Sequence, residues 1–180
     1  MQKLLFFLAF TVSLVSCWDF RKPIHYRQGK VWGYKPLYTT DSSILRPQVM
    51  GPQSVKFPGK IYAKGTLLFQ NDLGYGIHVI DNTNPAQASR IGFIKLSGNS
   101  EMSIKGNFLY ANSFTDLVVI DISNWQNSTE VKRIRNAFNQ GNMYTFIPLP
   151  EHKVYYECYS SGRLQVGWVR DSVYQNCYYP

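Results

Sequence analysis

The chain contains one stretch of about 40 residues twice, and this internal repeat constrains the fold more than any other feature. Residues 64–71 read KGTLLFQN, and residues 105–112 read KGNFLYAN, at an offset of 41. Residues 77–81 match residues 117–121 at an offset of 40, so one residue is lost between the two matches. Because insertions and deletions concentrate in loops, the shift in offset predicts a turn at that place.

Each repeat has the pattern of four short strands joined by tight turns. Gly65 and Gly106 each sit where a two-residue hairpin turn needs a positive φ. The Asp and Asn side chains that follow the third strand, within 81–84 and 121–124, are expected to bond back to the backbone of their own turn. The predicted strands are 61–64, 67–71, 76–80 and 90–95 in the first repeat, and 102–105, 108–112, 117–122 and 131–135 in the second. Four strands in about 40 residues are typical of one β-propeller blade, so we predict an all-β fold of tandem, four-stranded antiparallel repeats.

The third strand of the second repeat resembles a known sequence family. Residues 117–121, which read LVVID and are followed by Ile-Ser-Asn, resemble the LVIVD repeat. Residues 58–134, and more loosely 33–38, resemble LVIVD-repeat lipoproteins of Gram-negative bacteria. The resemblance implies a propeller-like fold in the cell envelope, and it implies no established activity, catalytic residue or cofactor. Trp125 stands where the first repeat has Pro85, so we expect an altered turn there.

The last part of the chain, residues 141–180, is predicted to be a degenerate partial third repeat. Residues 153–158 and 164–168 would be its second and third strands. With residues 57–99 and 100–140 as the complete repeats, the repeat domain spans 57–180. Two and a half blades are too few to close a propeller. The open alternatives are an open stack, self-association through the free sheet edges, and a truncated gene product.

The N-terminus reads as an export signal with a lipid attachment site. Lys3 supplies the positive start, and residues 4–15 form an apolar stretch too short to span a bilayer. The stretch ends Leu-Val-Ser-Cys, which resembles the lipobox of bacterial lipoproteins. We therefore expect residues 1–16 to be a signal peptide and Cys17 to carry acyl chains. Such chains bind a membrane firmly, which predicts a protein of the bacterial envelope, with the outer membrane as its expected location.

The three cysteines fit this interpretation. Once Cys17 is assigned to lipid, Cys158 and Cys177 remain as an even pair. Disulfides persist outside the cytosol, so these two residues are predicted to form one, with two free thiols as the alternative.

Residues 17–56 are predicted to be a basic, extended tether. They contain seven Lys and Arg residues against two Asp residues, and they therefore hold most of the net charge of +8. Several prolines and the lack of a regular hydrophobic period argue against a packed element, with one short strand near 31–38 as the exception. A basic segment beside a lipid anchor is attracted to anionic headgroups, although a solvated spacer is an equal alternative. Export argues against a nucleic acid partner.

Few side chains point to catalysis or to a metal. His78 corresponds to Val118 of the second repeat, so it is expected to pack rather than to react. The three histidines share no ligand spacing, and we expect neither a metal site nor a cofactor. A calcium site at residues 81–84 is a weaker alternative. Asp72, Glu101 and Asp116 would be the carboxylates of a glycan-acting enzyme.

Aromatic residues are concentrated near the C-terminus. Aromatic rings can stack on sugars or on a partner protein, while the alternative is a core for the terminal unit. We predict a non-catalytic binding or scaffold module for a surface glycan or a partner protein. The alternatives are a glycan-acting enzyme, or a subunit of one, and a relic of a longer propeller. The predicted ligand-binding residues are Tyr155, Tyr156, Tyr159 and Trp168.

Overall fold

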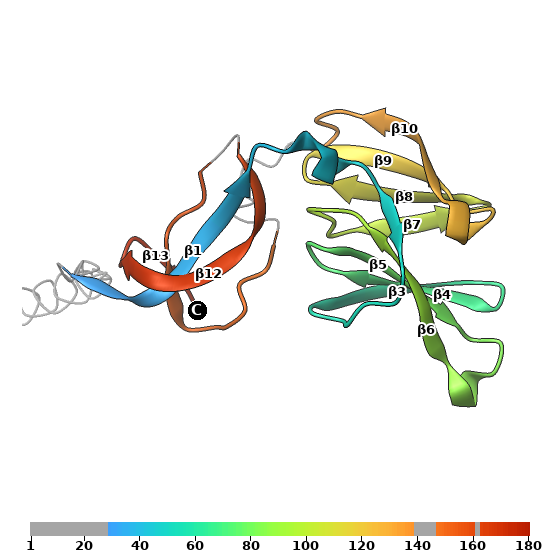
Figure 1. Cartoon of the computed structure of the whole chain (residues 1–180), viewed down its shortest axis with the longest axis horizontal. Coiled ribbons are helices and arrows are strands. Elements are labelled where there is room, and N and C mark those ends of the chain that lie inside the picture. Colours follow the sequence, from blue (N-terminus) through green and yellow to red (C-terminus); the bar gives the residue numbers. More distant parts are fainter. Residues whose placement is uncertain (1–28, 139–146, 161–162) are drawn as a thin grey trace, which may run out of the picture.

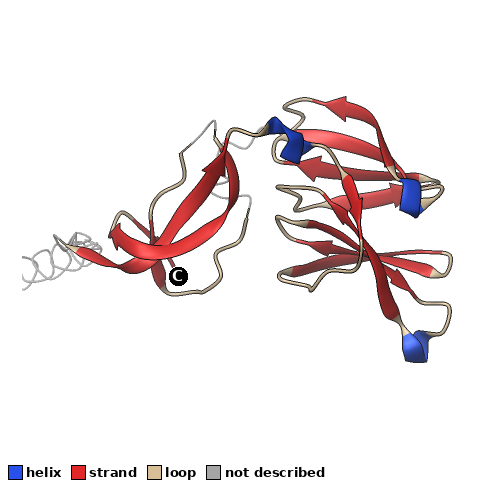
Figure 2. Ribbon diagram, in the orientation of Figure 1, coloured by secondary structure: helices blue, strands red, loops and turns tan. Residues whose placement is uncertain are grey.

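A computed structural model describes residues 29–138, 147–160 and 163–180 (Figure 1). The predicted signal peptide and Cys17 lie outside these residues. The described part is all-β, as predicted: it forms three sheets, and its only helical pieces are three short 3-10 turns (Figure 2). None of the sheets closes into a barrel.

The first repeat forms one antiparallel sheet whose strands are paired in sequence order. These strands are β3 (Pro58–Lys64), β4 (Leu67–Asp72), β5 (Gly76–Asp81) and β6 (Ser89–Lys95). A fifth strand, β2 (Gln48–Met50), pairs with the outer edge of β6. The four predicted strands are therefore confirmed, each with bounds that differ by at most a few residues.

The second repeat forms a separate sheet with the order β10-β9-β8-β7. Its strands are β7 (Met102–Lys105), β8 (Phe108–Ser113), β9 (Asp116–Asp121) and β10 (Thr129–Ile134). The third and fourth strands of each repeat are joined by a 3-10 turn, η2 (Pro85–Gln87) or η3 (Trp125–Asn127). The expectation of an altered turn at Trp125 is wrong. Both turns are capped in the same way by an Asn side chain, Asn84 or Asn124, which accepts a backbone N–H two residues later.

The hairpin and Asp turns have the predicted local structure. Gly65 and Gly106 both have φ near the left-handed region, at +59°. Asp81 Oδ1 accepts the Thr83 backbone N–H at 2.8 Å, and Asp121 Oδ1 accepts the Ser123 N–H at 2.8 Å. The same oxygens also accept the hydroxyls of these two residues.

The two repeats pack face to face around one hydrophobic core. The first repeat contributes Phe69, Ile77 and Val79, all fully buried. The second repeat contributes residues of its opposite face, among them Leu109 and Ile120. The face that the first repeat turns to the core is not equivalent to the face that the second repeat turns to it. This is expected when blades are stacked one after another in the same orientation. The core consists of Phe69, Ile77, Val79, Ile94, Leu96, Met102, Ile104, Leu109, Ala111, Val118, Ile120 and Ile122.

Trp125 connects the two repeats. Its ring lies over Gly92 of β6, where an added Cβ would stand 2.2 Å from the ring atom Cζ3. The residue that departs from the repeat pattern therefore fills a space that a glycine leaves open in the neighbouring sheet.

The third sheet is formed by both ends of the described chain and corrects two predictions. Its order is β12-β1-β11-β13, with β1 and β11 parallel. The short strand predicted near residues 31–38 is confirmed as β1, but it has ten residues and belongs to a sheet, so this part of the chain is not an extended tether. The described residues of 141–180 do not form a third repeat. A third repeat would pair β11 with β12, but β1 lies between them and satisfies the backbone of both. The strands are β1 (Lys30–Thr39), β11 (Val154–Tyr156), β12 (Leu164–Tyr174) and β13 (Cys177–Tyr179).

Two contacts stabilise this terminal sheet. Gly33 lets β1 approach β11, because a Cβ at this position would stand 2.2 Å from the Tyr155 carbonyl oxygen. Cys158 and Cys177 are joined by a disulfide, with 5.4 Å between their Cα atoms.

The segment between β1 and β3 is bound to both repeats and is not a solvated spacer. It contains η1 (Ser42–Leu45), whose first turn is capped by the Asp41 side chain. The Leu45 carbonyl accepts a hydrogen bond from Arg133 of the second repeat. Residues 51–57, which we call the crossing segment, then lead from β2 at one edge of the first sheet to β3 at the other edge.

Candidate functional site

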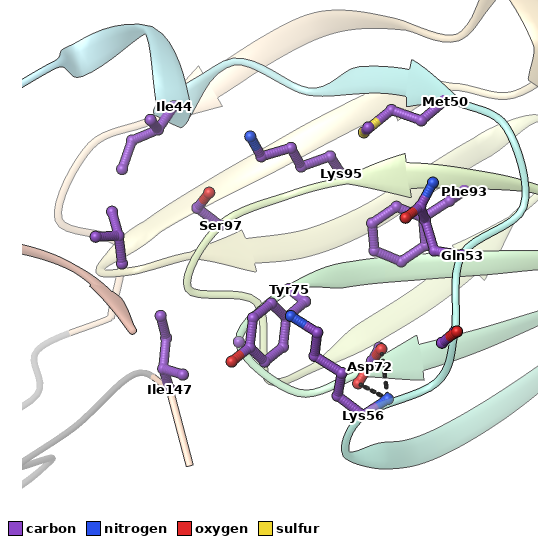
Figure 3. A pocket seen from close by; sticks show the side chains of 13 residues that line it. Ile44, Met50, Gln53, Lys56, Asp72, Tyr75, Phe93, Lys95, Ser97 and Ile147 are labelled. Atoms are coloured by element: carbon purple, nitrogen blue, oxygen red, sulfur yellow. Dashed lines mark hydrogen bonds between the residues drawn. The ribbon is translucent and has the colours of Figure 1, made fainter. Parts of the chain in front are cut away.

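A cleft of about 490 Å³ lies where the first repeat, the crossing segment and the terminal sheet meet (Figure 3). This volume is within the range of small-molecule sites, which often lie between structural units. The walls are mainly apolar, with a few charged and polar groups. The lining residues are Ile44, Met50, Gln53, Ser54, Lys56, Asp72, Gly74, Tyr75, Phe93, Lys95, Ser97, Ile147 and Val166.

Asp72, at the end of β4, binds the crossing segment to the sheet. Its carboxylate accepts the backbone N–H of Phe57 at 2.6 Å and that of Lys56 at 3.1 Å. It also lies 3.1 Å from His78 Nε2. The carboxylate is almost fully buried, and these contacts replace the water that it loses. We conclude that Asp72 shapes the cleft wall.

His78 is buried, as its repeat counterpart predicts. Its ring packs on Phe93 of the same sheet, with 4.8 Å between the ring centroids. Together with its contact to Asp72, this places His78 behind the cleft wall as a supporting residue.

Two lysines give the cleft its cationic character. Lys56 Nζ lies 4.0 Å from the centroid of the Tyr75 ring, a cation–π distance. Lys95 comes from the end of β6 and lines the same cleft (Figure 3). Burial raises the pKa of the Tyr75 hydroxyl, and the nearby Asp72 charge adds to this effect. Tyr75 therefore remains a protonated hydrogen-bond donor at neutral pH.

The three carboxylates considered for glycan hydrolysis have separate partners. Asp72 is held as described above. Glu101 pairs with Lys60 at 2.5 Å, and Asp116 pairs with Arg133 at 3.1 Å. No described contact joins any two of the three carboxylates.

The C-terminal aromatic residues pack in pairs within the terminal sheet. Tyr156 meets Trp168 edge to face with 5.7 Å between centroids, and the Trp168 indole N–H donates to the Ile147 carbonyl. Tyr155 lies 5.1 Å from Tyr178, centroid to centroid. The ring centroids of Tyr159 and Tyr38 are 6.0 Å apart. This arrangement favours the alternative reading, a core for the terminal unit. None of the four predicted ligand residues lines the cleft, and a ligand role for them stays a prediction.

Within the described ranges, no three His, Cys, Asp or Glu side chains are grouped closely enough to hold a metal ion. The carboxylate of Asp81, considered for calcium, instead accepts two hydrogen bonds from Thr83. These bonds, first from the hydroxyl and then from the backbone N–H, lower the pKa of Asp81. No helix in the described part of the chain has the length and apolar character needed to cross a membrane.

Most cleft residues were not recognised from the sequence. Tyr75 lies in a glycine-flanked hairpin loop, and this was the one local signal for an exposed functional side chain. The sequence gives no local signal of a site at Lys95, Ile147 or Val166. Only the docking of the terminal sheet beside the first repeat brings these three residues together.

The architecture is that of a protein built from stacked, propeller-blade-like β repeats. Residues 97–135, which include all of β7 to β10, match the family model of the LVIVD repeat. The chain therefore contains an LVIVD repeat, and the second repeat is this unit. No curated protein and no solved structure matches the chain.

Proposed function

We propose that the chain is an exported, lipid-anchored binding module of the bacterial envelope whose cleft receives an acidic surface glycan. The observation that carries the proposal is the cleft itself, with two lysine ammonium groups above walls of aromatic and aliphatic side chains. Gln53, Ser54 and the protonated Tyr75 line the cleft and offer hydrogen-bonding groups to sugar hydroxyls. Lys56 and Lys95 would attract a carboxylate or phosphate group on the sugar.

Two features support export and anchoring. Residues 1–17 have the pattern of a lipoprotein signal that ends in an acylated cysteine. The disulfide between Cys158 and Cys177 is a bond that persists in an oxidising compartment. Mass spectrometry of the protein from its native membrane tests this part. A mass increase from diacylglycerol and a third acyl chain at Cys17 is expected, and an unmodified Cys17 would refute the anchor.

Calorimetric titration tests the ligand. The detergent-solubilised mature chain is titrated with an oligogalacturonate, and separately with a neutral maltooligosaccharide of equal length. We expect binding of the acidic sugar only, with an affinity that falls as salt is added. Lys95→Gln is expected to weaken binding about tenfold, since one charge-assisted contact is lost.

Arg135→Gln is the matched control, because Arg135 is an exposed cation that does not line the cleft. Equal loss in both variants would indicate attraction by net charge alone. Absence of binding to either sugar would refute the glycan proposal.

A further inference from the structure

We infer that the outer face of the second repeat is an interface with a second copy of this chain, related by a two-fold axis. By outer face we mean the side of this sheet that is turned away from the first repeat. This inference is independent of the proposed glycan site.

The internal repeat shows what the outer face is built to contact. Six residues of the first repeat pack in the core between the repeats, four of them fully buried. The six equivalent residues of the second repeat are all apolar or aromatic. The equivalent pairs are Leu67 and Phe108, Phe69 and Tyr110, Ile77 and Leu117, Val79 and Val119, Ile91 and Val131, and Ile94 and Ile134.

Three of the six residues on the outer face are exposed, whereas Val119 is buried like its equivalent Val79. Ile94 is 0% exposed, whereas its equivalent Ile134 is 44% exposed. Phe108 and Val131 are 40% and 52% exposed. A sheet face that meets water normally alternates polar side chains with the buried side. Six apolar residues in these positions therefore indicate a face that becomes covered, and such patches mark interaction sites.

A second copy cannot stack on the outer face in the same orientation in which the two repeats of one chain stack on each other. That orientation would place the outer face against the free face of another copy's first repeat. This free face is crossed by residues 51–57, which Asp72 holds through the N–H groups of Lys56 and Phe57. It also has Gln70 and His78 where the second repeat has the apolar Ala111 and Val118. An apolar partner would therefore meet polar groups and a bound segment.

A two-fold arrangement avoids this obstruction. In an isologous interface the same patch serves both copies, and the assembly is closed. Two sheet faces that meet in this way form an ordinary aligned β-sandwich. Each copy then buries its six apolar residues against those of the other, and the blocked faces stay outside the interface.

Lys132 fits this interface better than it fits another stacked blade. It occupies the position of Gly92, the residue that leaves room for the Trp125 ring inside the chain. In the proposed dimer the Lys132 stem would cover part of the outer face, and its ammonium group would extend to the rim. Because Lys132 and Lys105 would approach their own counterparts, added salt should strengthen the dimer.

Cysteine cross-linking of the detergent-solubilised mature chain tests the arrangement. Tyr110→Cys, near the middle of the outer face where the two-fold axis would pass, is expected to give a covalent dimer on mild oxidation. Ile61→Cys, on the free face of the first repeat and 57% exposed, is the matched control and should give none by itself. Cross-linking only in a mixture of the two variants would show head-to-tail stacking and would overturn the two-fold inference. Absence of cross-linking in Tyr110→Cys would also overturn it.

Sedimentation velocity adds a measurement without new cysteines. The wild-type chain should sediment as a dimer that strengthens with salt. Phe108→Glu should raise the dissociation constant about 30-fold or more, because it places a charge on a face that the dimer buries. Its melting temperature at low protein concentration should be unchanged, because Phe108 is already exposed in the single chain. A wild-type chain that is monomeric at all concentrations would refute the interface.

Discussion

The two repeats and the terminal sheet are both β structure, but they are stabilised in different ways. In the repeats, each strand pairs with the next in sequence, and a continuous aliphatic core joins the two sheets. In the terminal sheet, β1 pairs with β12 from the opposite end of the chain. Its buried apolar residues are few, and aromatic pairs and a disulfide supplement them.

Because their strands pair locally and share one core, the two repeats are expected to be more stable than the terminal sheet. The terminal sheet closes a long loop before its contacts form, and the cost of this closure must be offset by the disulfide and the pairing of β1. The following predictions test this contrast, from the largest expected effect to the smallest.

Phe69→Ala removes a fully buried ring from the core between the repeats. We expect a loss of about 3–5 kcal/mol in the free energy of unfolding, because a large cavity remains. Urea unfolding followed by circular dichroism measures it. Tyr155→Ala, in the half-buried terminal sheet, should cost clearly less. Equal losses would mean that the terminal sheet is as tightly packed as the repeats.

Replacing both Cys158 and Cys177 by Ser removes the disulfide of the terminal sheet. The expected cost is about 2–4 kcal/mol, since the unfolded chain gains freedom. Hydrogen exchange should speed up in β12 and β13 and remain unchanged in β8 and β9. If exchange speeds up equally in all four strands, the terminal sheet and the repeats unfold as one unit.

Gly92→Ala places a methyl group against the Trp125 ring. Overpacking should destabilise the protein by about 1–3 kcal/mol. Adding Trp125→Ala should remove most of this extra cost, and a double-mutant cycle by thermal unfolding measures the coupling. Gly51→Ala is the control, because a Cβ there meets no atom within 4 Å. Additive effects would show that the ring does not couple the repeats.

Asp81 and Asp121 should contribute a small acid sensitivity to the repeats. Hydrogen bonds from the Thr83 and Ser123 hydroxyls, and then from their backbone N–H groups, lower the pKa of each Asp in the folded state. Their stabilisation is therefore complete above the unfolded pKa of about 3.9 and is lost as pH falls through the lower folded value.

Urea unfolding at a series of pH values from about 6 to 2 tests this effect. Asp81→Asn should flatten the acid limb of the curve, since Asn can accept the same bonds without titrating. An unchanged acid limb would show that the Asp81 hydrogen bonds do not couple to protonation.

The sequence by itself determined the repeats and their internal structure. Alternating apolar residues, Gly65 and Gly106 at the hairpins, and Asn84 and Asn124 at the 3-10 turns act within a few residues of the chain. Such short-range signals specify strands and turns regardless of the rest of the molecule, and so the eight strands were predicted closely.

Only the tertiary structure decided the sheet partners of β1, the identity of the C-terminal unit and the position of the cleft. The pairing of Lys30 with Tyr174 joins residues from opposite ends of the described chain. Ile147 and Val166 meet Lys95 only because the terminal sheet docks beside the first repeat. The physical reason is that a strand accepts many partners with similar local energies, and the free energy of the whole packed molecule selects one of them.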